Sequence, residues 1–445
     1  MVTDRSIPGT SAHWRAALSI GIRLLGQASK RGGYRRVPTP AALVDDIEAW
    51  LREDAKEMLV ALRRLPADAG RTALRLRLHP AAGEVEVAVA EGGHVSAVGA
   101  TAEVGPGYHT YLAHLLRRLG TENGITWEPP DVQAGTGDLT GFFETGRRED
   151  AERPLLVWLR ETLQRACDQR ALGGEPVELL PSTGDKFTID GAIATPLGPR
   201  DDTWLSAALT NPRTAVEIWP WFADATDARY LLNRALCLMW TEVRWRPAIE
   251  EGEPEVVEEV LRLLRRAFPL EPSLPYPWRE WKELLDIGGD PDPMRERVES
   301  EAATAPEAPP IGYRRNPVRI EQAGWLLTVP GSFAIHRTDD ELRAGEGDRT
   351  ITIAASPTAD QAGPMAAETF LDRVAAHLGP EVLHHRDGEV VSRAKLGLDP
   401  TSVVEVAVLE GYAAVRGSGA AIRIVIHDAA DWEWALEMWR SLRPA

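Results

Sequence analysis

Hydrophobic and polar residues alternate in three successive segments near the start of the chain. Leu74, Leu76 and Leu78 are separated by arginines, and valines occupy every second position over 85–89. A shorter alternating run follows over 95–98. Because successive side chains of a strand point to opposite faces of a sheet, this pattern predicts an antiparallel β-meander with one solvated face.

Helical periodicity surrounds the meander. Residues 12–28 carry apolar side chains at i, i+4 spacing, which predicts an amphipathic helix that leads into a basic stretch ending at Arg36. Thr39 and Pro40 predict the cap and first turn of a second helix over 40–65. Further helices are expected at 108–119, 151–172, 226–246 and 254–268.

A segment rich in Ala, Pro and Glu at 303–316 predicts a semi-rigid linker. It divides the chain into an N-terminal region, 1–302, and a C-terminal module, 317–445, and the polar, Gly-rich stretch 128–150 marks a further candidate division. The class expected from these patterns is α+β. A helix-rich N-terminal region with a small antiparallel sheet precedes a C-terminal α+β module.

The C-terminal module opens with GWLLTVPGSF and closes with AIRIVIHDAADWEWALEMWRSL. Asp428 is the expected N-cap of its last helix, and Trp432, Leu436 and Trp439 form the stripe expected to pack on the sheet. The short Gly-Ser-Gly at 417–419 joins two expected strands and predicts a hairpin turn.

In these opening and closing segments, and in having a strand before its first helix, the module resembles the PsbP-like superfamily. That superfamily includes DcrB, LpqN and the Eag-type effector chaperones. The resemblance covers 317–445 and does not extend to residues 1–300. It implies a PsbP-like α+β module that binds a protein partner through its sheet. Trp325, Phe333 and Trp434 are the candidate protein-binding residues.

Charge and composition restrict the classes of partner. The chain has 445 residues and a formal net charge of −17 at pH 7, so a nucleic-acid partner is not expected. No apolar run approaches the roughly 18 residues of a spanning helix, so stable membrane insertion is not expected. Cys167 and Cys237 lie in apolar helical patterns typical of buried thiols, and a cytoplasmic location is expected.

The sequence offers little that is typical of a catalytic, metal or cofactor site. His109 and His114 diverge on their expected helix, and the glycines near 135–141 lack the spacing of a phosphate-binding loop. We therefore expect no catalytic residue, no metal and no cofactor. Arg200 and Asp201, in a loop after an expected strand, are a candidate anion-binding pair, although a structural ion pair at a turn is favoured.

Tryptophan is frequent, with 15 residues. A set between 219 and 281 is either an exposed binding platform or core, and its helical spacing with leucine favours core. The members of this set are Trp219, Trp221, Trp240, Trp245, Trp278 and Trp281.

The resemblance to the PsbP-like superfamily implies a non-enzymatic protein-binding adaptor or chaperone, and we expect it to act in a bacterial secretion, toxin–immunity or phage-defence system. Its acidic charge favours a basic or amphipathic protein partner. The alternative is an enzyme that acts on a small anionic substrate at the 195–204 loop. That alternative requires a deep pocket containing Arg200.

Overall fold

The computed structural model describes residues 20–445 except 30–37, 69, 132, 173–176, 181–184, 188, 190, 290, 339, 361–362 and 400–405. The fold is α+β, because helices combine with antiparallel sheets, as predicted. The chain forms two compact units. The first combines 1–174 with 201–234, and the second combines 175–200 with 235–445.

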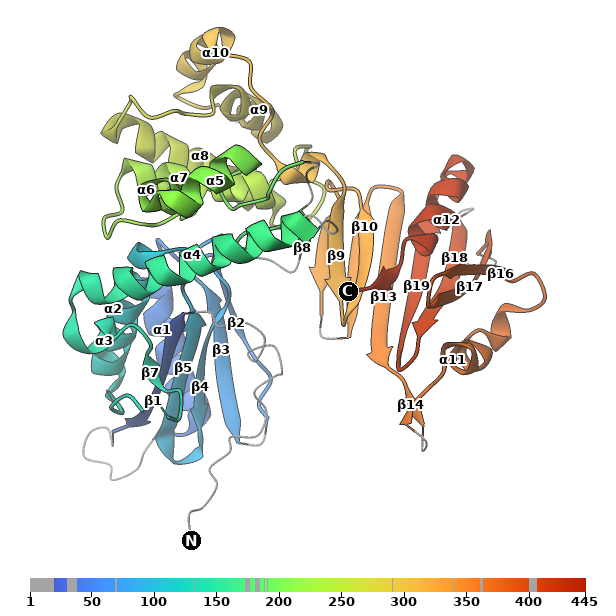
Figure 1. Ribbon diagram of the computed structural model, residues 1–445, viewed down its shortest axis with the longest axis horizontal. Coiled ribbons are helices and arrows are strands. Elements are labelled where there is room, and N and C mark those ends of the chain that lie inside the picture. Colours follow the sequence, from blue (N-terminus) through green and yellow to red (C-terminus); the bar gives the residue numbers. More distant parts are fainter. Residues whose placement is uncertain are drawn as a thin grey trace. The chain divides into compact units, whose positions relative to one another are not determined.

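The first unit is built on one antiparallel sheet, whose hydrogen-bonded order is β2–β3–β4–β5–β1–β6, with β7 also paired to β1. The strands are β1 (Gly21–Ala28), β2 (Ala61–Arg64), β3 (Arg71–Arg77), β4 (Val85–Ala90), β5 (His94–Ala100), β6 (Ile125–Trp127) and β7 (Gly137–Asp138). Helices α1 (Pro40–Asp54) and α2 (Pro106–Asn123) pack against this sheet (Figure 1). Strands β3, β4 and β5 confirm the predicted meander.

Two predictions about the first elements have different outcomes. Thr39 caps α1 as expected, because its hydroxyl accepts a hydrogen bond from the amide of Ala42 at 3.4 Å. The helix expected over 40–65 is wrong beyond Asp54, since 61–64 form β2 and pair with β3. The helix expected over 12–28 is wrong for its second half, which forms β1. Ile22 and Leu24 are buried on one face of that strand. Residues 12–19 lie outside the described part of the chain.

The described residues of the first unit also form α3 (Phe142–Thr145), α4 (Arg148–Leu172), α5 (Asp202–Thr210) and α6 (Pro212–Ala215). After α6 the chain buries Trp219 and Trp221, and the indole of Trp219 donates to the carbonyl of Ala102 at 2.7 Å. These two tryptophans, together with Trp240 and Trp281 of the second unit, are buried, which confirms the core interpretation for them.

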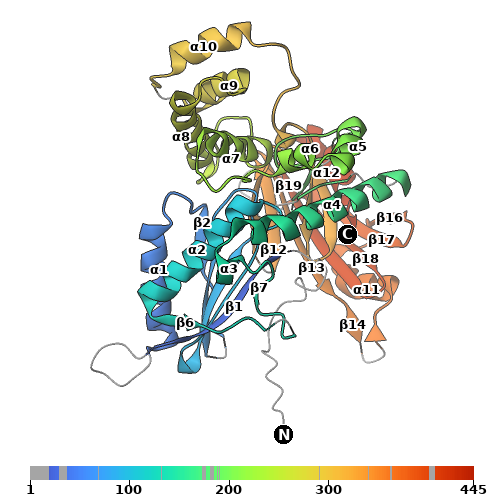
Figure 2. The ribbon, with the colours of Figure 1, turned by 60° about the vertical axis from the view of Figure 1, so that its left-hand side comes forward.

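Helix α7 (Ala228–Thr241) contains the boundary between the units, at 234/235. In the second unit α8 (Glu253–Leu270), α9 (Trp278–Gly288) and α10 (Arg295–Thr304) pack in succession (Figure 2).

The second unit contains two larger antiparallel sheets. One has the order β20–β10–β9–β8, and the other has the order β11–β12–β13–β19–β18–β17–β16. The strands of the first are β8 (Asp185–Phe187), β9 (Val318–Gln322), β10 (Trp325–Val329) and β20 (Arg443–Pro444). Those of the second are β11 (Ala334–Arg337), β12 (Glu341–Glu346), β13 (Arg349–Pro357), β16 (Leu383–Asp387), β17 (Val390–Leu398), β18 (Ala407–Val415) and β19 (Ser418–Ile426). A small pair joins β14 (Ala359–Asp360) to β15 (Gly363–Pro364).

The segment expected as a linker, 303–316, lies inside the second unit. Residues 306–310 are exposed, but Tyr313 and Arg314 are buried in the core. Tyr313 stacks on Phe187 with ring centroids 5.0 Å apart. The Pro-rich composition is therefore confined to an exposed connection, and the residues after it anchor the sheet that β8 and β9 share.

Two helices pack on the larger sheet of the second unit, α11 (Ala367–Val374) and α12 (Trp432–Arg440). Trp439 is buried against Gly411, as predicted, but Trp432 is exposed. The expected N-cap, Asp428, accepts from the amide of Ala430 at 2.8 Å, but α12 itself begins after Asp431, whose side chain makes no capping hydrogen bond. Ala435 and Trp439 form the buried side of the helix. The hairpin expected at 417–419 is confirmed by the pairing of β18 with β19.

Candidate protein-binding face

The strands of the first unit bring five arginines onto one face of their sheet. In the strand register, Arg63 pairs with Arg75, Arg75 with Glu86, Glu86 with Val98 and Val98 with Arg23. Side chains at directly paired positions share a face. This row therefore crosses five neighbouring strands.

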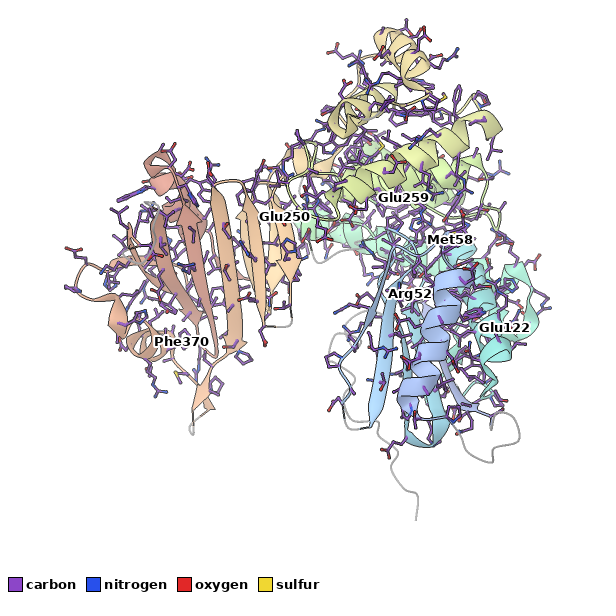
Figure 3. All side chains as sticks on the ribbon, turned by 180° about the vertical axis from the view of Figure 1, so that it is seen from behind. Arg52, Met58, Glu122, Glu250, Glu259 and Phe370 are labelled. Atoms are coloured by element: carbon purple, nitrogen blue, oxygen red, sulfur yellow. The ribbon has the colours of Figure 1, made fainter. Side chains whose placement is uncertain are left out.

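Arg71 and Arg77 lie on the same face, because they are an even number of residues from Arg75 in β3. We call this surface the arginine face, defined by Arg23, Arg63, Arg71, Arg75 and Arg77. Helix α1 covers the opposite face, and Figure 3 shows α1, marked by Arg52, in front of the strands in the view from behind.

Glu84 and Glu86 supply the carboxylates on the arginine face. Glu84 bonds Arg63 at 3.1 Å, and Glu86 bonds Arg75 at 3.0 Å and also pairs with Arg71. Glu84 and Glu86 thus bind three of the five arginines, Arg63, Arg71 and Arg75. Five guanidinium groups stand on one face of this sheet, although the net charge of the chain is −17.

Between the arginines the face carries small residues. Ala73, Ala88 and Ser96 pair across β3, β4 and β5. The exposed ring of His94 lies on the same face, because His94 is four residues from Val98 in β5 and pairs with Gln27. Ala73 and Ala88 are 3% and 2% exposed, so these two alanines offer a partner little surface.

The larger sheet of the second unit has a similar face opposite α12. Its register aligns Arg343, Thr352, Arg423, Glu410 and Lys395 in one row. Arg343, Arg423 and Lys395 are exposed. Helix α11, with Phe370, covers a neighbouring part of this face, where Leu371 packs on Val391 and Ala414 (Figure 3).

The structure corrects two of the candidate protein-binding residues. Trp325 and Phe333 are each 1% exposed, because both point into the core beneath the sheet. The indole of Trp325 donates to the hydroxyl of Ser418 at 2.9 Å. Trp434 is half-buried, with its ring beneath the guanidinium of Arg349 at 5.1 Å.

Arg200 and Asp201 each have a local structural role. The guanidinium of Arg200 donates to the carbonyl of Pro199 at 3.1 Å, and its backbone bridges to Ile193. Asp201 is the N-cap of α5, where its carboxylate accepts from the amide of Trp204 at 2.7 Å. The loop is therefore built as a turn followed by a helix cap.

The Gly-Pro-Gly-Tyr-His segment at 105–109 forms a buried cluster that sequence reasoning missed. A Cβ on Gly107 would lie 2.2 Å from the carbonyl oxygen of Ala223, so the helix starts where only glycine fits. Tyr108 packs near His79 and Trp221, with ring centroids 6.4 and 6.2 Å away. Burial, with the nearby charge of Arg234, lowers the pKa of His79 well below its usual value, so the ring is neutral.

His109 is part of a buried hydrogen-bond network. Its two ring nitrogens contact Thr101 at 2.8 Å and Asp138 at 3.2 Å. Burial raises the pKa of Asp138, but hydrogen bonds from His109 and from the amides of Thr140 and Phe143 outweigh it and lower that pKa. Throughout the described residues, no three His, Cys, Asp or Glu side chains converge as metal ligands would.

The comparisons with known proteins add little. No protein-family model matches the chain, and no curated protein matches it. A crystal structure from Bacteroides thetaiotaomicron VPI-5482 is similar over 28% of this chain and 46% of that chain, less than half its length, at 6% identity and a TM-score of 0.24. A similarity of that size carries no argument about fold or function. The PsbP-like resemblance of 317–445 stays a prediction.

Within the described helices, none is long and apolar enough to span a bilayer.

Proposed function

We propose that this chain is a non-enzymatic adaptor that binds a protein partner, and that the arginine face is its main contact surface. The observation that carries the proposal is the row that crosses five strands, in which Arg23, Arg63 and Arg75 stand on one face. Guanidinium groups along such a row favour a partner segment rich in Asp and Glu, because they bind carboxylates through charge-assisted hydrogen bonds.

This partner differs from the basic or amphipathic one expected from overall charge. A partner contacts one surface of the protein and not its average charge, and the arginine face carries five guanidinium groups. The open face of the second unit supports the same chemistry, since Arg343, Lys395 and Arg423 are exposed there. We also propose that the protein acts in the cytoplasm, within a bacterial secretion, toxin–immunity or defence system. Neither Cys167 nor Cys237 forms a disulfide, as is usual in a reducing compartment, and this supports a cytoplasmic location.

A protein partner is favoured over nucleic acid. Single-stranded nucleic acid is held by aromatic stacking as well as by charge. The described strand positions of the arginine face carry one ring, that of His94, and no Phe, Tyr or Trp. The two glutamates within the face would also repel phosphates. A phosphate backbone therefore fits this surface less well than carboxylates at spaced positions.

The test uses the full chain and a fluorescein-labelled decaglutamate peptide, followed by fluorescence anisotropy. Combining Arg23→Gln, Arg63→Gln and Arg75→Gln should weaken binding roughly 3- to 100-fold, because each exposed charge pair contributes about 0.2–1 kcal/mol. Binding should also weaken as salt rises from about 0.05 to 0.3 M, since exposed charges are screened.

The matched control removes the same charge elsewhere in the first unit, with Arg153→Gln, Arg160→Gln and Arg165→Gln on the exposed side of α4. This control should bind the peptide like the unaltered chain. If both variants lose affinity for the peptide equally, binding depends only on the net charge of the chain, and the proposal is wrong. Tighter binding of a single-stranded oligonucleotide, with the same dependence on the face, would assign the surface to nucleic acid.

A further inference from the structure

The connection between α10 and β9 contains a short proline-rich segment, 305–311, with the sequence APEAPPI. Each of the residues 306–310 is exposed, and none of them belongs to a helix or a strand. In Figure 2 the loop that leaves α10 stands apart from α7 and α8. The segment therefore presents Pro306, Pro309 and Pro310 to solvent.

The backbone of this segment favours the polyproline II helix. A proline ring fixes φ at about −65°, and the residue before a proline is held in an extended conformation. Ala305 precedes a proline and has a φ of −61° and a ψ of 136°, close to the polyproline II values of about −75° and about +145°. Ala308 and Pro309 also precede prolines. Such a helix makes no internal hydrogen bonds, so its backbone stays available to solvent and to a partner.

Two residues in the first turn of α9 hold the ends of the segment. Arg279 donates to the carbonyl of Ala305 at 2.9 Å, and Glu280 accepts from the amide of Ile311 at 3.1 Å. Between these ends, no hydrogen bond or ion pair joins 306–310 to any described residue. The segment is therefore fixed at both ends and uncovered in the middle, so a partner pays little of the entropy of ordering it.

The repeat of the polyproline II helix determines which residues of the segment share an edge. With three residues per turn, Ala305, Ala308 and Ile311 form one edge. Ala305 and Ile311 are half-buried, and Ile311 packs on the hydrophobic core of the second unit. This edge is therefore the one that faces the protein at both ends of the segment, and the other two edges face outward.

We propose that 306–310 is a docking motif for a partner domain whose groove is lined with aromatic side chains. Pro306 and Pro309 are three residues apart, so they share the second edge of the helix and form an apolar ridge. Aromatic-lined grooves recognise two prolines at this P-x-x-P spacing, because a segment that is already extended loses little conformational entropy on binding. Pro310 widens the ridge from the third edge.

Glu307 shares the third edge with Pro310 and forms no ion pair with any described residue. Its exposed carboxylate favours a groove with a basic residue beside the aromatic rings. The motif lies in the second unit and uses none of the arginine face, so it goes beyond the acidic partner proposed above and adds a second contact of a different kind. The two proposals can therefore fail independently.

Photocrosslinking of the full chain in an extract of its native host tests the motif. Thr304→benzoylphenylalanine places a photoreactive group on an exposed residue beside the motif and leaves 305–311 unaltered. Excess free peptide TAPEAPPIG, the sequence of 304–312, should suppress the crosslink to the partner. The same peptide with its three prolines replaced by alanine should not suppress it. Capture of a protein is no support by itself, and the difference between the two peptides is the expected result.

Isothermal titration of the full chain with the purified crosslinked partner then measures the contribution of the ridge. Pro306→Ala combined with Pro309→Ala should weaken binding at least about tenfold, because the apolar ridge and the stiffness of the segment are both lost. The matched control, Pro272→Ala with Pro275→Ala, alters two exposed prolines between α8 and α9 and should leave the affinity unchanged. Glu307→Gln should weaken binding by up to about fivefold, as expected for one exposed charge pair.

The two double-proline variants should have the same thermal midpoint, because each removes two exposed prolines, and this comparison separates lost binding from lost stability. The proposal is overturned if no crosslink is suppressed by the proline peptide alone, or if the control variant loses as much affinity as Pro306→Ala with Pro309→Ala. It is also overturned if the crosslinked partner is released by the arginine-face substitutions and not by the proline ones. In each of these outcomes 306–310 serves only as a connection between α10 and β9.

Discussion

Replacing Trp439 with alanine should lower the opening free energy of the larger sheet of the second unit more than any other single substitution on α12. Trp439 is 1% exposed, and a Cβ on Gly411 would lie 2.8 Å from its ring, so glycine leaves the space that the indole fills. A buried aromatic side chain removes about 150–250 Å² from water, which at ~25 cal/mol per Å² gives about 4–6 kcal/mol. The side chain of alanine buries only a small part of this area, so we expect the opening free energy to fall by about 3–5 kcal/mol.

Two further variants make the reasoning specific. The indole nitrogen of Trp439 is buried without an acceptor among the described residues, an arrangement that costs about 1–3 kcal/mol. Trp439→Phe removes that nitrogen and keeps most of the apolar area, so it should stay within about 1.5 kcal/mol of the unaltered chain. Trp432→Ala, on the same helix but 38% exposed, should cost less than about 1 kcal/mol.

The assay is native-state hydrogen exchange at amides of β18 and β19, the strands on which α12 packs. Exchange reports the opening free energy of that sheet, whereas global unfolding of a chain with two units need not be a single transition. If Trp432→Ala lowers protection as much as Trp439→Ala, the assignment of the buried side of α12 is wrong. If Trp439→Phe is as harmful as alanine, the cost assigned to the unpaired indole nitrogen is wrong.

Two other predictions concern a helix start and a buried carboxyl group. Gly107→Ala should lower the thermal midpoint of the first unit markedly, because its Cβ would meet the carbonyl of Ala223 at 2.2 Å, whereas Gly83→Ala, with no atom within 4 Å, should change it little. Burial raises the pKa of Glu178 to about 8, above its unfolded value of 4.5. The folded chain thus keeps a proton that the unfolded chain loses, and stability should fall as pH rises from about 4.5 to 8, by up to about 1.4 kcal/mol per pH unit. Urea titrations across this range should show that slope in the unaltered chain and a smaller one in Glu178→Gln.

Local patterns predicted the elements whose partners are close in sequence. The alternation around Leu74 and over 85–89 was enough to predict β3 and β4. The glycines at 417–419 were enough to predict the β18–β19 hairpin. The apolar residues around Ile22 fit both the helical and the strand period. The segment forms a strand because it pairs with β5, more than 60 residues away in the sequence. No local pattern contains that information.

The candidate surfaces depend on register and on distant neighbours. The sequence around Arg75 predicted a solvated face, but only the strand register places Arg23 and Arg63 beside it. The composition of 303–316 is that of a linker, yet burial of Arg314 beside Asp185 makes the end of this segment part of the core.

The division of both units into separated stretches has a consequence for synthesis on the ribosome. The chain passes from one unit to the other at 174/175, 200/201 and 234/235. When 174 residues have been made, the first unit still lacks Trp219 and Trp221, against which Gly105 and Gly107 pack. Strand β8 at 185–187 emerges early but must wait for β9 at 318–322 before its hydrogen bonds can form. The N-terminal unit therefore cannot finish folding before part of its neighbour has been exposed, and slow translation over this interval should leave the nascent chain dependent on chaperones.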